Sequence, residues 1–210
     1  MSNPINIGVL SIQGDIEENI DACKKALVEL GIPGKVYPVK YSEEIQGIDG
    51  LVIPGGESTV ISSLMLLQQQ KWQSLKQKIS DGMPVLGTCA GMIILANKVY
   101  DKTVGETRQE LLKNLDIIVE RNAFGRQHES FEADLEIPLI GNEPFKGIFI
   151  RGPIIKETGK NVKILSKYDG NIVAVQQKNI IGTSFHPELT DDTRIHKQFI
   201  LNIIENKKSK

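Results

Sequence analysis

The chain has 210 residues, of which 40% are hydrophobic and 24% are charged. That length can bury one sizeable core but is tight for two, so we expect a single domain over residues 1–210. The formal net charge is -1, from 25 basic and 26 acidic residues. Without a basic excess to neutralise phosphates, we expect neither a nucleic-acid partner nor an anionic membrane surface.

The sequence also predicts where the protein works. It has no apolar run long enough to cross a bilayer. Its first residues carry no basic segment followed by an apolar leader, so we expect a cytoplasmic protein. Of its two cysteines, Cys23 lies in a predicted helix and is interpreted as a small buried apolar residue. A disulfide to Cys89 is not expected in a reducing compartment.

The first half of the chain predicts strands and helices in alternation. Apolar residues recur at helical spacing from Ile16 to Leu30, and Gly31 then ends that helix. Short continuous apolar runs predict buried strands. We expect strands at 5–12, 36–39, 50–54 and 84–87 and helices at 16–30, 58–69, 72–81 and 90–98. Such an alternation is typical of a parallel sheet covered by helices on both faces.

The second half predicts mostly strands, at 117–120, 131–137, 147–151, 162–167, 172–177 and 180–185, before a last helix at 192–206. Strands that follow one another without helices indicate an antiparallel extension of the sheet. The predicted fold class is therefore α/β, with three α/β/α layers, a mostly parallel central sheet and an antiparallel extension. The polar stretch 100–113 matches no motif, and we assign it no function.

A cysteine lies between two glycines in the segment Gly87-Thr88-Cys89-Ala90-Gly91. The segment joins a predicted strand to a predicted helix, as in a nucleophile elbow with cysteine as the nucleophile. Such a turn strains the central residue, and the flanking glycines relieve crowding. The helix start lowers the pKa of a thiol beside it. The alternative is a buried structural cysteine in a glycine-rich turn.

A base and its orienting group follow the predicted strand 180–185. His186 and Glu188 are two residues apart, so in an extended segment they project to the same face. Glu188 can then hold one ring nitrogen while the other faces a thiol, which is the nucleophile–base–orienter arrangement. A surface histidine near a loop carboxylate is the alternative.

A third element, Pro54-Gly55-Gly56-Glu57-Ser58, also joins a strand to a helix. Backbone N–H groups of such a turn can point at a developing negative charge. An ordinary strand–helix turn is the alternative. The sequence has no phosphate-binding loop. One free cysteine with scattered histidines does not make a zinc set, so we expect no metal.

Together these residues resemble the class I, triad-type glutamine amidotransferase family, and within it the glutaminase subunits of pyridoxal 5'-phosphate synthase. The resemblance runs from Ile7 to about Phe199. The cysteine elbow and His-Pro-Glu belong to the wider class, and two further motifs point to the narrower group. These two are Pro54-Gly55-Gly56-Glu57-Ser58-Thr59 and Arg121-Asn122-Ala123-Phe124-Gly125-Arg126-Gln127. One departure from the family is Gly152, a small residue in place of the usual alanine.

The resemblance implies a flavodoxin-like fold and a role for each matched residue. Cys89 attacks the glutamine carboxamide, His186 moves the proton and Glu188 orients His186. The N–H groups of Gly56 and Ala90 form the oxyanion hole. Gln13 matches a position near the oxyanion loop and the partner interface. The implied glutamine-binding residues are Gly56, Glu57, Ser58, Arg121, Ile150 and Arg151.

The resemblance also implies a partner and no cofactor. Ammonia from L-glutamine passes to a separate synthase subunit, resembling PdxS, in a hetero-oligomeric complex that makes pyridoxal 5'-phosphate. Three alternatives remain open at this stage. They are an amidotransferase subunit serving another synthase, a non-catalytic binding module with the same fold, and a cysteine peptidase on a related scaffold.

Overall fold

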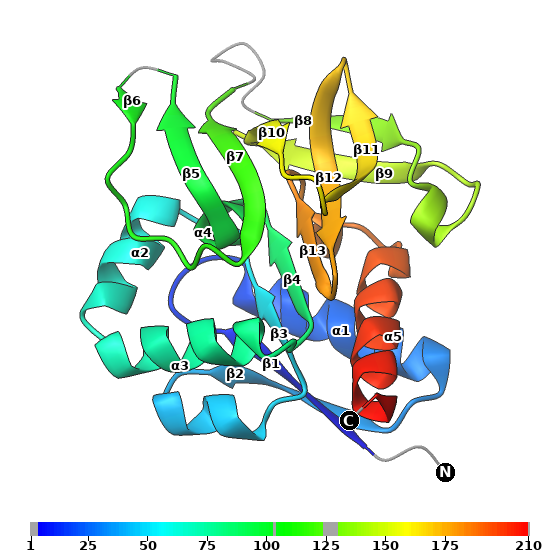
Figure 1. Cartoon of the computed structure of the whole chain (residues 1–210). Helices are drawn as coiled ribbons and strands as arrows, with labels where there is room; N and C mark the ends of the chain where they lie inside the picture. Colours follow the sequence, from blue (N-terminus) through cyan, green and yellow to red (C-terminus); the bar gives the residue numbers. More distant parts are fainter. Residues whose placement is uncertain (1–3, 103, 124–129, 210) are drawn as a thin grey trace.

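The computed structural model describes residues 4–102, 104–123 and 130–209 (Figure 1). Its centre is a run of parallel strands in the order β2-β1-β3-β4-β13. Their bounds are β1 Ile5–Leu10, β2 Gly34–Val39, β3 Gly50–Ile53, β4 Val85–Thr88 and β13 Ile180–Thr183. Every residue of β3, β4 and β13 is buried. Their continuous apolar sequences fit strands that are covered on both faces.

Helices cover the two faces of this sheet and create a separate apolar core on each side (Figure 1). On one side pack α1, Ile16–Leu30, and α5, Arg194–Lys208. On the other side pack α2, Ser58–Leu66, α3, Gln69–Ser80, and α4, Ala90–Leu95. Helix α1 begins and ends where the apolar spacing predicts, because Gly31 adopts the left-handed conformation that stops it. The structure therefore confirms the three-layer α/β/α prediction.

The predicted extension is present beyond β13, and it is antiparallel except for the parallel pair of β5 and β7. The sheet continues in the order β12-β10-β7-β5-β6, and β11 pairs with β12 on the side. A separate antiparallel pair is formed by β8 and β9. The bounds are β5 Ala96–Asp101, β6 Gly105–Glu106, β7 Leu115–Arg121, β8 Ser130–Leu135, β9 Phe145–Ile150, β10 Ile154–Thr158, β11 Lys163–Tyr168 and β12 Asn171–Gln177.

Some predicted bounds and elements are wrong. The helix expected at 90–98 ends at Leu95, and the chain continues directly as strand β5, whose residue Val99 pairs with Val119 of β7. Pairing within a sheet thus decides a segment that helical propensity leaves open. The sequence pattern does not predict strands β5, β6 and β10, nor the short 3-10 helices η1 Ser42–Gly47, η3 Pro138–Ile140 and η4 Pro187–Leu189. No helix in the described ranges is long and apolar enough to span a membrane.

The register of the parallel strands brings distant segments together. Thr88 at the end of β4 pairs with Thr183 at the end of β13, and Ile53 of β3 pairs with Gly87. The residues that follow β3, β4 and β13 consequently emerge at one edge of the sheet. In open α/β sheets this carboxyl edge is where ligands bind.

Candidate active site

Cys89 occupies a strained turn between β4 and α4. Its φ of 49° and ψ of -104° lie outside the regions that an L-residue prefers. One hydrogen bond and one close backbone approach stabilise the turn. The Cys89 N–H donates to the carbonyl of Thr183 at 2.8 Å. At Gly91, a Cβ atom would lie 1.9 Å from the carbonyl oxygen of Ile53, so only glycine fits there. The expected nucleophile-elbow geometry is present.

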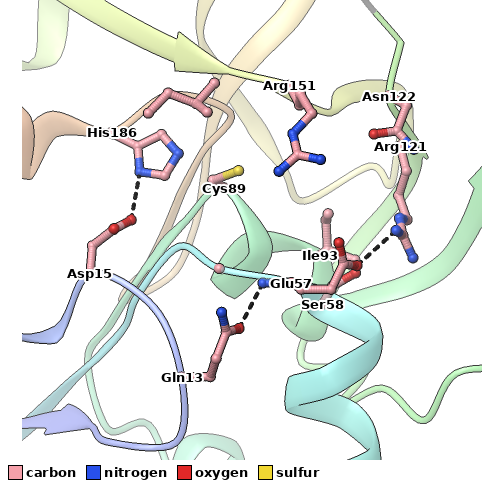
Figure 2. A pocket seen from close by; sticks show the side chains of 12 residues that line it. Gln13, Asp15, Glu57, Ser58, Cys89, Ile93, Arg121, Asn122, Arg151 and His186 are labelled. Carbon is pink, nitrogen blue, oxygen red and sulfur yellow. Dashed lines mark hydrogen bonds and ion pairs between the residues drawn. The ribbon is translucent and has the colours of Figure 1, made fainter. Parts of the chain in front are cut away.

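His186 lies beside this turn, at the start of η4. Its Nδ1 is 2.9 Å from Oε1 of Glu188, whose side chain is fully buried. The backbone N–H of His186 donates to the carbonyl of Ile148 at 2.8 Å, which ties the segment to β9. Figure 2 shows the second ring nitrogen on the side of Cys89. The spacing of two residues thus brings the carboxylate to the imidazole, although through a 3-10 turn instead of an extended strand.

A second carboxylate, which the sequence analysis missed, also approaches the imidazole. Asp15 Oδ2 lies 3.1 Å from Nδ1 of His186 (Figure 2). Burial by itself lowers the pKa of His186. Hydrogen bonds to Asp15, Cys89 and Glu188 outweigh burial and raise that pKa from 6.5 to about 12. The hydrogen bond to His186 in turn holds the pKa of Asp15 below its ordinary value. The two carboxylates therefore favour the charged form of the imidazole.

Among the described residues, one group of side chains could hold a cation, and it consists of Asp15, His186 and Glu188. Donor atoms of Asp15, His186 and Glu188 lie within 4.8 Å of one another. Both carboxylates converge on one ring nitrogen at hydrogen-bonding distances, so an N–H proton accounts for the arrangement without a metal.

The loop after β3 carries Gly56, whose N–H the resemblance assigns to the oxyanion hole. Gly56 has a φ of 148°, and the side-chain oxygen of Gln13 accepts from the next N–H, that of Glu57, at 2.8 Å. Ala90 is the first residue of α4, where no intrahelical acceptor exists for its N–H. Gln13 therefore contacts the oxyanion loop, where the resemblance places it.

Two arginines lie near the mouth of the site. Arg121, at the end of β7, pairs with Oε1 of Glu57 at 2.8 Å and also donates to Gln109 at 3.3 Å. Gln109 belongs to the polar stretch to which the sequence analysis assigned no function, and the Ser58 hydroxyl donates to it at 3.4 Å. Arg151 follows β9 with a φ of 45°, an unusual conformation for a non-glycine residue.

One pocket of about 240 Å³ joins these groups (Figure 2). Among the predicted site residues, Glu188 and Ala90 lie outside its lining, and both are buried. The predicted residues that line it are Gln13, Gly56, Glu57, Ser58, Cys89, Arg121, Ile150, Arg151 and His186. The pocket also includes Asp15, Ile93 and Asn122, which the sequence analysis did not propose for the site. The motif residues 124–127 lie outside the described residues.

The model of the SNO glutamine amidotransferase family matches residues 9–205. The chain belongs to this family. The SNO family match covers the elbow, the histidine segment and both arginines, and it confirms the resemblance deduced from the motifs. A chain of this family is a glutamine amidotransferase, so the pocket around Cys89 is the candidate site for that activity.

Relatives of this SNO family chain agree over nearly its whole length. "Pyridoxal 5'-phosphate synthase subunit PdxT" of Nitrosopumilus maritimus (strain SCM1) is 49% identical over 201 residues, which cover 96% of this chain and 98% of the relative. The protein of the same name from Streptomyces coelicolor is 48% identical and covers 95% of this chain and 94% of the relative. A solved structure, "Crystal structure of glutamine amidotransferase", is 39% identical, with a TM-score of 0.80 over 94% of this chain and 98% of that chain.

Proposed function

We propose that this chain is the glutaminase subunit of a pyridoxal 5'-phosphate synthase. It hydrolyses L-glutamine to L-glutamate and ammonia, and a separate synthase subunit consumes the ammonia. One observation carries the proposal: a strained cysteine, an imidazole held by carboxylates, and two arginines line one pocket. The names of its full-length relatives support the acceptor reaction.

The first half of the reaction forms a thioester. In the proposed mechanism the reacting form pairs an imidazolium at His186 with a thiolate at Cys89, because neighbouring opposite charges attract. The sulfur attacks the carboxamide carbon and forms a C–S bond, and the electron pair moves to the oxygen. The N–H groups of Gly56 and Ala90 receive this oxyanion. When the intermediate collapses, the C–N bond breaks, and His186 gives its Nε2 proton to the leaving nitrogen, which departs as ammonia.

The second half of the reaction restores the enzyme. The imidazole of His186 is now neutral and removes a proton from a water molecule, which attacks the thioester carbon. The C–S bond breaks and Cys89 regains its thiolate. The new carboxyl group releases its proton to solvent, and the product leaves as glutamate. The proton from water stays on His186, so the starting ion pair is regenerated. The balance is one glutamine and one water consumed, and one glutamate and one ammonia formed.

Glutamine binding uses the charged wall of the pocket. The planar guanidinium of Arg121 or Arg151 can pair bidentately with the substrate's α-carboxylate. Glu57, which is partly exposed and already pairs with Arg121, offers a carboxylate for the α-ammonium group. Ser58 and Ile150 complete the contact surface. The two ends of a zwitterionic amino acid thus meet groups of opposite charge.

The partner of this proposal is a synthase subunit resembling PdxS, in a cytoplasmic hetero-oligomer. Ammonia that escapes into neutral water becomes ammonium and loses its nucleophilicity, so direct transfer to a bound synthase protects it. We expect weak glutaminase activity in the isolated chain and a rise when the partner binds near Gln13. The motivating feature is the glycine pair at Gly55 and Gly56, which can change backbone conformation at low cost.

The test is glutamate release from L-glutamine, with and without the synthase subunit of the same organism. Release that increases with the synthase and disappears in Cys89→Ala is the expected result. Release that the synthase does not change would retain the glutaminase and assign it to another acceptor. If neither glutamate nor ammonia is released, with or without the synthase, the result would contradict the proposed activity. It would favour the alternative of a non-catalytic binding module.

A further inference from the structure

The ring nitrogen Nδ1 of His186 has two carboxylates within hydrogen-bonding distance. Glu188 lies at 2.9 Å and Asp15 at 3.1 Å. A single N–H can be shared between two acceptors in this way. The two carboxylates differ in their surroundings, since the Glu188 side chain is fully buried whereas that of Asp15 is 33% exposed and lines the pocket. The proposed triad leaves the second of these contacts without a role.

The ordinary task of Asp15 would be to cap helix α1. It occupies the N-cap position, where aspartate usually accepts a hydrogen bond from an N–H of the first turn. No such bond is formed by its side chain. Within the described residues, this carboxylate pairs with His186 instead. The Asp15 side chain therefore contacts a residue 171 positions further along the chain and does not cap its own helix.

The segment that carries Asp15 packs closely against the oxyanion loop. At Gly14 the φ is +112°, and a Cβ there would lie 1.6 Å from the carbonyl oxygen of Gly55. A Cβ at Gly55 would in turn lie 2.8 Å from Oδ2 of Asp15 and 2.4 Å from Cε1 of His186. The carboxylate, the imidazole and the loop thus pack together with no room for another atom, and this packing fixes the direction of the Asp15 side chain.

We propose that Asp15 is a second positioning carboxylate, which shares the Nδ1 proton of His186 with Glu188 during glutamine hydrolysis. This role rests on the proposed function, because it concerns the base of that reaction. Glu188 fixes the ring from the protein interior, and Asp15 holds it from the pocket side. Together they keep Nε2 directed at Cys89 and favour the charged form of the ring.

Three titratable groups face this imidazole, each from a different element. They are Asp15 at the start of α1, Glu188 in η4 and Cys89 after β4. Replacing Asp15 by asparagine keeps the shape and a hydrogen-bond acceptor but removes one negative charge. Asparagine is as good an N-cap as aspartate, so helix α1 should keep its stability. Asp15→Ser is a second variant that also retains a capping side chain.

Kinetics on the full chain in complex with its synthase give the first test. The neutral ring of His186 gains a positive charge when it takes the proton from water, and a neighbouring carboxylate stabilises such a charge by about one pKa unit or more. Asp15→Asn should therefore lower kcat about ten-fold or more with KM nearly unchanged. The two carboxylates share one proton, so each can partly replace the other. Asp15→Asn should therefore lower kcat by a larger factor in a Glu188→Gln background than in the wild type. Asp21→Asn, on the exposed side of the same helix, is the matched control and should leave kcat unchanged. Equal losses in both backgrounds, or a rise in KM alone, would overturn the proposal.

The protonation of the ring gives a second test that needs no turnover. The chain has three histidines, so the ring ¹⁵N signals of His186 can be assigned by substitution and followed with pH. We expect the ring to lose its proton at lower pH in Asp15→Asn and Asp15→Ser than in the wild type and Asp21→Asn. Identical ring signals in all four proteins would overturn the role of Asp15. A wild-type complex without glutaminase activity would instead contradict the proposed function, and the ring signals would still decide the role of Asp15.

Discussion

His196 on helix α5 should make the folded protein sensitive to acid. Its side chain is fully buried, and neither ring nitrogen has a partner among the described residues. Burial lowers the pKa of His196 from 6.5 to about 4. Between these two pH values the unfolded chain binds a proton that the folded chain excludes, so the free energy of unfolding falls as the pH falls.

The size of this effect follows from the two pKa values. At about 1.36 kcal/mol per pKa unit, the interval from 6.5 to about 4 corresponds to about 3 kcal/mol. A typical domain has a free energy of unfolding of only about 5–15 kcal/mol. A single buried imidazole therefore removes a substantial share of the stability on acidification. Because the group is fully buried, solvent screening does not reduce this contribution.

The assay compares the wild type with His196→Leu by urea unfolding at pH 7 and pH 4.5. Trp72, the single tryptophan, is buried and reports unfolding by fluorescence. Leucine removes two unpartnered polar atoms and keeps most of the volume, so the variant should be about as stable at pH 7. Its loss of stability at pH 4.5 should be smaller by about 2 kcal/mol or more. Other groups with shifted pKa values, such as Asp15 and Asp192, are present in both proteins and contribute equally to their acid sensitivity. If both proteins lose the same free energy of unfolding between pH 7 and pH 4.5, the role of His196 is refuted.

Three further predictions concern the elbow, the substrate pocket and a buried lysine. Gly91→Ala should abolish glutaminase activity and lower Tm, because the new Cβ would lie 1.9 Å from the Ile53 carbonyl, whereas Gly47→Ala, with 3.6 Å to its nearest neighbour, should change neither. Arg121→Lys should raise KM for L-glutamine about ten-fold with a smaller change in kcat, because lysine cannot pair bidentately with a carboxylate; an unchanged KM in steady-state assays would exclude Arg121 from substrate binding. Lys71→Met should lower the free energy of unfolding by about 1–3 kcal/mol, because the buried Nζ donates to the carbonyls of Val39 at 3.2 Å and Lys40 at 2.8 Å. Urea unfolding measures this loss of free energy. If Lys71→Met is as stable as the wild type, the prediction is wrong and the two carbonyls find other donors.

The parallel half of the fold could be predicted from the sequence because each element carries its own signal. Helix α1 shows helical spacing and ends at a glycine, and strands β3 and β4 are short continuous apolar runs. The end of α4 could not be predicted in this way. Residues 96–98 have no breaker, and only pairing with β7 turns them into a strand. Such long-range pairing leaves no trace in a local window.

The candidate site shows the same division between local and long-range signals. The elbow and the His186–Glu188 pair could be proposed because their partners are neighbours in the chain. Asp15 and Gln109 could not, since their contacts with His186 and Arg121 depend on the packing of segments far apart in sequence. The one available hint for Asp15 was its place directly after the Gln13-Gly14 motif. The cytoplasmic location and the single-domain organisation stay predictions.

The central claim, that Cys89 forms a covalent bond with the glutamyl group, has a direct test. The complex is incubated with L-glutamine, quenched in acid and digested, and the cysteine-containing peptides are weighed by mass spectrometry. Cys23 is the internal control, because it is fully buried in α1 and burial raises its thiol pKa well above the ordinary value. The account predicts a glutamyl thioester on the Cys89 peptide that persists in Cys23→Ala and is absent in Cys89→Ala. Glutamate release with no adduct on Cys89, or with undiminished rate in Cys89→Ala, would contradict it.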